Sequence, residues 1–282
     1  MTTSTPGTRA SAPGARGSDL PRQLTVTVCF IVCLVGSMIG VGVFGGTPIA
    51  QAAGGALNAD ATFLAPASGA FSIWSVIYTG LGAYTIWQWL PSQRSSARQR
   101  SLGWLVSASL LLNAAWILSI QAGWVGFSVL VIVVLLAVLA LCFARYSRTP
   151  ARNWIEAIVV DGTLGLYLGW VSVATCANIA AALTAAGFDG FGLAPEIWSI
   201  AVLAVVAALG VALAAYGRGR LAPAAALAWG LSWIAVSRLN GELPSNGTAV
   251  AAVVAAAVVA LAAVVYRFIG RNRIPAASAA RG

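Results

Sequence analysis

The feature that most limits how this chain can fold is a series of long apolar segments separated by short polar loops. Of its 282 residues, 60% are hydrophobic and only 8% are charged, with a mean hydropathy of +0.88. Segments of about 20 apolar residues are long enough to cross the hydrocarbon core of a bilayer as helices. The composition excludes an ordinary water-soluble domain and predicts an all-α, polytopic transmembrane helix bundle.

About eight spans are expected from the positions of the apolar segments. The expected spans are residues 24–44, 68–90, 102–120, 125–146, 154–185, 197–216, 222–236 and 249–268. The seventh is short for a span. Residues 1–22 form a basic tail rich in Ser, Thr, Pro, Gly and Ala, a composition typical of disorder, and residues 270–282 form a second basic tail.

All basic residues are arginines, and their positions predict the orientation of the bundle. Three lie in the tail before the first span, and the others follow the second, fourth, sixth and eighth spans, whereas the alternate loops carry a single arginine, Arg238. By the positive-inside rule, this alternation places both termini in the cytoplasm. Topology accounts for the net charge of +9. We therefore expect the lipid bilayer as a partner and no nucleic acid. Basic residues that are all arginine and a high alanine content suggest a bacterial protein, which we expect to lie in the cell (inner) membrane.

Residues that usually carry chemistry are scarce in this sequence. The chain has no histidine, which excludes metal sites and general bases that depend on histidine. All four cysteines lie inside apolar segments and are interpreted as packing residues. Neither a nucleophile–base pair nor a metal-ligand cluster is visible in the sequence, so we expect neither an enzyme nor a bound cofactor.

The stretch from 162 to 183 combines an apolar composition with a polar and aromatic stripe. At about 100° per residue, Tyr167, Trp170 and Asn178 fall on one side of a helix. An unpaired amide in hydrocarbon costs roughly several kcal/mol, so this side is expected to face protein or a cavity. The small residues Gly165 and Gly169 allow a neighbouring helix or a flat ligand to approach closely.

The second and third spans carry similar stripes. Their members are Phe71, Trp74 and Tyr78 in the second span and Asn113 and Trp116 in the third. Three helices that present aromatic rings and amides suit an apolar cavity with a few hydrogen-bonding groups. Alternatively, the tryptophans are interfacial anchors and the asparagines join helices to each other. The pattern alone leaves both interpretations open.

The same residues carry a family resemblance. The run LYLGWVSVATCAN from Leu166 to Asn178 resembles the P-Y-L-x-W-x-x-F-A-x-x-L-N motif in the last helix of the TspO/MBR family. This family comprises the tryptophan-rich sensory proteins and relatives of the peripheral-type benzodiazepine receptor. The run from Asn113 to Trp116 is similar to its L-N-x-x-W motif.

A third motif lies at the start of the second span. Pro66 and the run WSVIY from Trp74 to Tyr78 are similar to the family pattern P-P-x-W-x-F-x-x-x-W-x-x-x-Y. The chain departs from the family at three positions, where Pro, Trp and Pro are replaced by Ala65, Ser68 and Leu166.

The resemblance rests on about residues 25–185 and implies a five-helix TspO-like bundle over residues 23–186. Residues 187–269 then form three additional transmembrane helices. The implied function is binding of a flat apolar ligand, tetrapyrrole-like or porphyrin-like, in an intramembrane cavity, with a sensing or transport role. The implied ligand-binding residues are Phe71, Trp74, Tyr78, Asn113, Trp116, Tyr167, Trp170 and Asn178.

Two acidic residues near the start of the fifth span suggest an alternative function. Asp161 lies about 7–8 Å beyond Glu156 along a helix, which places a carboxylate inside the membrane. Such a group is a candidate coupling site, so the alternative is a secondary transporter of a small solute that uses Asp161. An arginine partner for Asp161 is the structural interpretation. Glu156 is expected to pair with an arginine of the preceding loop, namely Arg145, Arg148 or Arg152.

The first span contains a GxxxG pattern from Gly36 to Gly40. Two glycines one turn apart form a flat surface on which a second helix can pack closely. The pattern predicts either a homodimer face or close packing inside one subunit.

Overall fold

The computed structural model describes residues 19–272, and this part of the chain contains helices and loops but no strand. Its long helices are α1 (Asp19–Gly40), α3 (Ile73–Trp87), α5 (Ala97–Gln121), α6 (Val125–Arg148), α8 (Thr163–Ala185), α9 (Pro195–Tyr216), α10 (Leu221–Asn240) and α11 (Asn246–Asn272). The short elements are η1 (Val43–Gly45), α2 (Ala52–Gly55), η2 (Ser68–Ser72), α4 (Pro91–Arg94), α7 (Trp154–Glu156), η3 (Ala157–Gly162) and η4 (Gly190–Gly192).

Each predicted span overlaps one of these long helices, which confirms the polytopic bundle. Within residues 19–272, six helical segments are long and apolar enough to cross a membrane: α1, α5, α6, the continuous run Trp154–Ala185, α9 and Asn246–Gly270 of α11. Helix α3 has only 15 residues, because a 3-10 turn takes the first part of the predicted second span. Helix α10 has 20 residues and extends past the predicted limit at 236, but it carries the charged Arg238.

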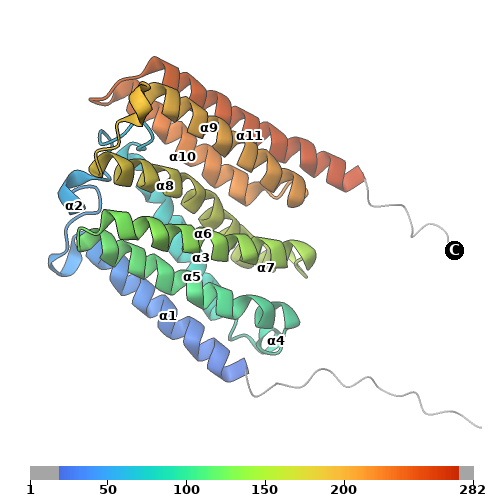
Figure 1. Ribbon diagram of the computed structural model, residues 1–282. Coiled ribbons are helices and arrows are strands. Elements are labelled where there is room, and N and C mark those ends of the chain that lie inside the picture. The colour runs from blue at the N-terminus through green and yellow to red at the C-terminus, as the bar shows by residue number, and fades with distance from the viewer. Residues whose placement is uncertain (1–18, 273–282) are drawn as a thin grey trace, which may run out of the picture.

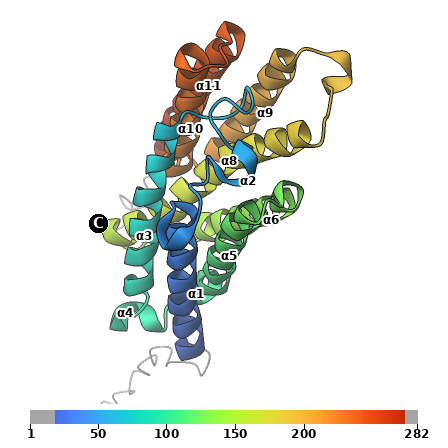
Figure 2. The ribbon, with the colours of Figure 1, turned by 90° about the vertical axis from the view of Figure 1, so that its left-hand side faces the viewer.

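The helices form two groups that share α8. One apolar core lies among α1, α3, α5, α6 and α8, and a second lies among α9, α10 and α11 with Val173 of α8. Figure 1 shows α8 between the two groups, and Figure 2 shows α3 along one face of the bundle. The start of α1 and the end of α11 lie at the same end as α4 and α7 (Figure 1), which we call the arginine-rich end.

Small residues set the close contact between the two groups. A side chain at Gly165 or Gly169 of α8 would collide with Pro223 or its neighbours at the start of α10. These glycines therefore admit a neighbouring helix rather than a ligand, because α10 covers them. The boundary predicted between the five-helix bundle and the last three helices crosses this interface and stays a prediction.

The GxxxG pattern of α1 packs inside the subunit. An added Cβ at Gly36 would lie 3.3 Å from the Cβ of Ala114, and one at Gly40 would lie 3.0 Å from a methyl group of Ile117. Both neighbours belong to α5, so both glycines serve the contact between α1 and α5. A homodimer through another surface stays a prediction.

A π-helical segment, η3, joins α7 to α8. In a π-helix the backbone hydrogen bonds close over five residues rather than four, which adds one residue to the turn. The segment lies at the arginine-rich end and carries Asp161. The predicted basic tails lie outside the described residues, except that residues 19–22 are already helical and belong to α1.

The alternation of arginines predicts which loops face the periplasm. In a variant without native cysteines, single cysteines at the exposed positions Ala122 and Ala186 should react with a membrane-impermeant maleimide added to intact cells. Cysteines at the exposed positions Arg94 and Arg148 should react only after the membrane is permeabilised. Labelling of both pairs from the same side would contradict the predicted topology.

Candidate functional site

A cavity of about 390 Å³ lies at the end of the bundle opposite the arginine-rich end, between α1, α3, α5 and the loop that follows α1. This volume falls within the range of small-molecule sites. The walls are mainly apolar and aromatic, with a few hydroxyl groups. The lining residues are Ser37, Met38, Gly40, Val41, Pro48, Ile49, Ala50, Ser68, Phe71, Trp74, Ser75, Tyr78, Trp116 and Ile117.

The loop over this cavity is attached to the helix ends by specific hydrogen bonds. The backbone N–H of Thr47 donates to Oε1 of Gln121 at 3.1 Å, and Nε2 of Gln121 donates to the carbonyl of Thr47 at 2.6 Å. The backbone N–H of Ile49 donates to the carbonyl of Gly40 at 2.9 Å. These bonds hold Pro48 and Ile49 against the cavity.

Five aromatic rings form a continuous cluster at one wall and directly behind it. Trp74 stacks on Tyr78 with ring centroids 5.1 Å apart and an interplanar angle of 17°. The edges of Tyr167 and Trp170 contact Trp74 at centroid distances of 5.8 and 6.2 Å. Phe71 makes a further edge contact with Trp170 at 5.7 Å. Rings in these arrangements fix one another and leave flat faces for a ligand.

The predicted site residues divide into two groups. Phe71, Trp74, Tyr78 and Trp116 line the cavity. The other four lie behind its wall, where they position the lining residues; they are Asn113, Tyr167, Trp170 and Asn178.

Two of the residues behind the wall make hydrogen bonds to neighbouring helices. Nδ2 of Asn113 donates to the hydroxyl of Tyr78 at 2.9 Å and to Sγ of Cys33 at 3.3 Å. The hydroxyl of Tyr167 donates to the carbonyl of Ser109 at 3.2 Å, which joins α8 to α5. The cavity wall therefore depends on contacts between helices.

Asn178 joins three helices. Its Oδ1 accepts a hydrogen bond from Nε1 of Trp116 at 2.7 Å, and its Nδ2 donates to Oγ of Ser128 at 2.9 Å. The side chain is fully buried, so both bonds replace bonds to water. The contacts match the interpretation of Asn178 as a link between helices, and they orient Trp116 toward the cavity.

Sequence reasoning missed the contribution of α1 and the following loop. Met38, Val41, Pro48, Ile49 and Ala50 line the cavity, yet none belongs to an aromatic or amide stripe. The available signal was the run of glycines and Pro48 after the first span, which indicates a structured turn but not its direction. Ser68, which replaces a family tryptophan, does lie at the cavity.

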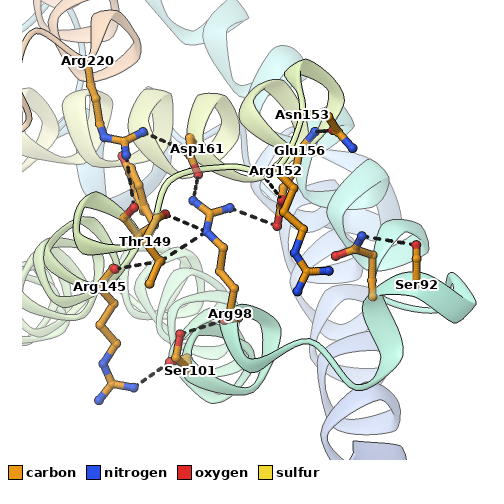
Figure 3. A network of polar contacts seen from close by, with 12 residues as sticks. Ser92, Arg98, Ser101, Arg145, Thr149, Arg152, Asn153, Glu156, Asp161 and Arg220 are labelled. Carbon is orange, nitrogen blue, oxygen red and sulfur yellow. Dashed lines mark hydrogen bonds and ion pairs between the residues drawn. The ribbon is translucent and has the colours of Figure 1, made fainter. Parts of the chain in front are cut away.

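A network of buried charges occupies the arginine-rich end (Figure 3). Arg98 of α5 donates to Oδ1 of Asp161 and lies 3.3 Å from Oε1 of Glu156. Nε of Arg98 also donates to the carbonyl of Thr149, which follows α6, at 3.1 Å. Arg220, the residue before α10, donates to Oδ2 of Asp161 at 2.5 Å. One arginine thus joins α5, α6 and η3, and Asp161 extends the network to α10.

The expected partner of Glu156 was wrong. Glu156 pairs with Arg98 rather than with the side chain of Arg145, Arg148 or Arg152. Its second oxygen accepts a hydrogen bond from the backbone N–H of Arg152 at 2.8 Å. The preceding loop therefore supplies a backbone donor instead of a charge. Sequence spacing favoured near arginines, whereas Arg98 approaches across the helix interface.

Arg238, the exception to the arginine pattern, has a structural role at the opposite end. Its side chain is fully buried and donates to the carbonyl of Ala59 at 2.6 Å and to that of Leu243 at 2.7 Å. Asp60 lies 3.9 Å away. Because Arg238 is buried and bonded to these partners, it is not an exposed loop arginine of the kind that sets topology.

These features define a polytopic helical membrane protein with an aromatic cavity beneath a structured loop. The family model described as TSPO-like protein matches residues 23–266. The chain belongs to this TSPO-like family, and the match includes α9, α10 and α11 as well as the first five spans. Comparisons with curated proteins and with solved structures give no match.

Asn178→Leu should lower the melting temperature whether or not a ligand is present. The change keeps the volume but removes two buried hydrogen bonds, at a cost on the order of 1 kcal/mol in total. The matched control is Thr175→Val, since within the described part of the chain the Thr175 hydroxyl bonds only to the carbonyl of Val171 in its own helix. If Asn178→Leu melts like the unmodified protein and loses only ligand-induced stabilisation, Asn178 is a ligand group instead.

Arg98→Met should destabilise the protein strongly. It leaves Glu156 buried without its arginine and Asp161 with Arg220 alone, and removing one partner of a buried ion pair costs about 3–5 kcal/mol. Arg145→Met is the control, because Arg145 makes one exposed hydrogen bond to a backbone carbonyl. Thermal unfolding in detergent measures both. Equal losses for the two variants would show that the network contributes little.

Proposed function

We propose that this protein binds a flat apolar ligand of the tetrapyrrole class in the cavity beneath the loop after α1. The observation that carries the proposal is the aromatic wall built from Phe71, Trp74 and Tyr78, with Trp116 across the cavity. Such a wall suits a planar, weakly polar molecule because ring faces stack and apolar side chains remove its surface from water.

Polar atoms near the wall support a ligand with a few hydrogen-bonding groups. Nε1 of Trp170 and Oδ1 of Asn113 are buried, and neither has a hydrogen-bond partner among the described residues. Buried polar atoms are usually satisfied, so these two atoms call for a partner. Both residues lie behind the wall, so a water or a polar ligand group that enters between the lining side chains would supply it.

The proposed role is sensing or transport of that ligand in a bacterial inner membrane, by binding rather than by catalysis. A loop over a cavity, attached by hydrogen bonds to the end of α5, is an element that a bound ligand can order or displace. The alternative was a secondary transporter coupled through Asp161. Pairing with Arg98 and Arg220 accounts for that carboxylate structurally, so no contact among residues 19–272 specifically favours the alternative.

Titration of the purified full chain with protoporphyrin IX, followed by the absorbance of the porphyrin, tests the proposal. Trp74→Leu and Phe71→Leu should each weaken binding by about tenfold. Loss of one aromatic stacking contact costs about 1–3 kcal/mol, taking base stacking on aromatic side chains as the nearest analogue.

Trp124→Leu is the matched control, because Trp124 is 63% exposed and lies outside the cavity. It should bind porphyrin as the unmodified chain does. Melting temperatures without ligand establish that each variant is folded. Equal affinities for Trp74→Leu, Phe71→Leu and Trp124→Leu would refute binding in this cavity.

A further inference from the structure

A second hollow lies on the other side of α3, toward the arginine-rich end. It has a volume of about 600 Å³ and is bounded by α3, η3, the start of α8, the start of α10 and Arg267 of α11. At about 100° per residue, Val76 and Gly80 point roughly opposite Trp74 and Tyr78. Helix α3 therefore separates this groove from the aromatic cavity.

The groove is apolar along its length and charged at one end. Val76 on α3 and Ile158 on η3 form part of its walls and are 56% and 61% exposed. Ile158 belongs to the run Trp154–Ala185, which is long and apolar enough to cross a membrane, so an exposed apolar wall at this place suits contact with lipid. Its charged lining residues are Asp161, Arg220 and Arg267.

The charges at this end are unbalanced in favour of arginine. Asp161 is already paired with Arg98 and Arg220. The other two acidic side chains at this end are also engaged, Glu156 by Arg98 and Asp19 by Arg100. Arg267 lines the groove and has no acidic partner within the described part of the chain.

We propose that this groove binds one anionic phospholipid. Its phosphate lies against Arg267, with Arg220 adjacent, and one acyl chain lies along the apolar wall formed by α3 and η3. The unpaired guanidinium supplies charge complementarity for the phosphate, and arginine is suited to bidentate contacts with phosphate oxygens. The lipid-facing apolar wall selects a lipid over a free anion. This site is separate from the proposed ligand cavity and does not depend on it.

Native mass spectrometry of the full chain with added phosphatidylglycerol or phosphatidylcholine tests the proposal. We expect one retained phosphatidylglycerol, held more strongly than phosphatidylcholine of the same chain length. Arg267→Gln should reduce its retention about fivefold, which corresponds to the roughly 1 kcal/mol that one arginine contributes at an anionic lipid surface. Ala83→Leu, which fills the groove from α3, should reduce retention without changing a surface charge.

Arg148→Gln is the matched control, since Arg148 is exposed at the same end but lies outside the groove. It should retain the lipid as the unmodified chain does, and melting temperatures should be similar for all three variants. Equal losses for Arg267→Gln and Arg148→Gln would overturn the proposal in favour of general surface attraction. Equal retention of the two lipids, competition by free glycerol phosphate, or full retention by Ala83→Leu would overturn it as well.

Discussion

The pairing of Arg98 with two carboxylates is the interaction on which the arrangement of the helices depends. Arg98 is only 6% exposed, and its charge is costly to desolvate. Its burial is tolerated because Asp161, Glu156 and a backbone carbonyl surround the guanidinium. These partners come from η3, α7 and the end of α6. Asp161 then engages Arg220 at the start of α10, so the position of α8 relative to both helix groups is set at this network.

The cavity depends on the second helix group as well as on the first. Nε1 of Trp229 in α10 donates to the carbonyl of Ala70 at 2.9 Å, and the backbone N–H of Ala67 donates to the carbonyl of Trp233 at 3.1 Å. These bonds fix the segment that leads into Phe71. Helix α10 therefore supports the aromatic wall, which agrees with a family match that continues through this helix.

Sequence reasoning located the helices and much of the aromatic wall, because both follow from periodic patterns. Hydropathy marks the spans, and helical spacing brings Trp74 and Tyr78 to one face. It did not separate lining residues from supporting ones: Trp116 and Asn178 carry the same helical signal, yet only Trp116 reaches the cavity. The contribution of Pro48 and Ile49 depends on loop geometry, and the partner of Glu156 depends on packing between distant helices. Neither loop geometry nor the packing of distant helices produces a periodic pattern in the sequence.

The π-helical turn between α7 and α8 adds one residue to the helix, and this residue affects both the ion pairs of Arg98 and the aromatic contacts of α8. In a regular α-helix, residues five apart point roughly 140° away from each other, so one arginine would not reach both Glu156 and Asp161. Closing the turn over five residues brings the two carboxylates into phase with Arg98. The same extra residue rotates all of α8 about its axis, which determines that Tyr167 and Trp170 face Trp74. The length of this turn thus sets the rotation of α8 about its axis. It links the charge pairing at the arginine-rich end to the packing of the aromatic rings.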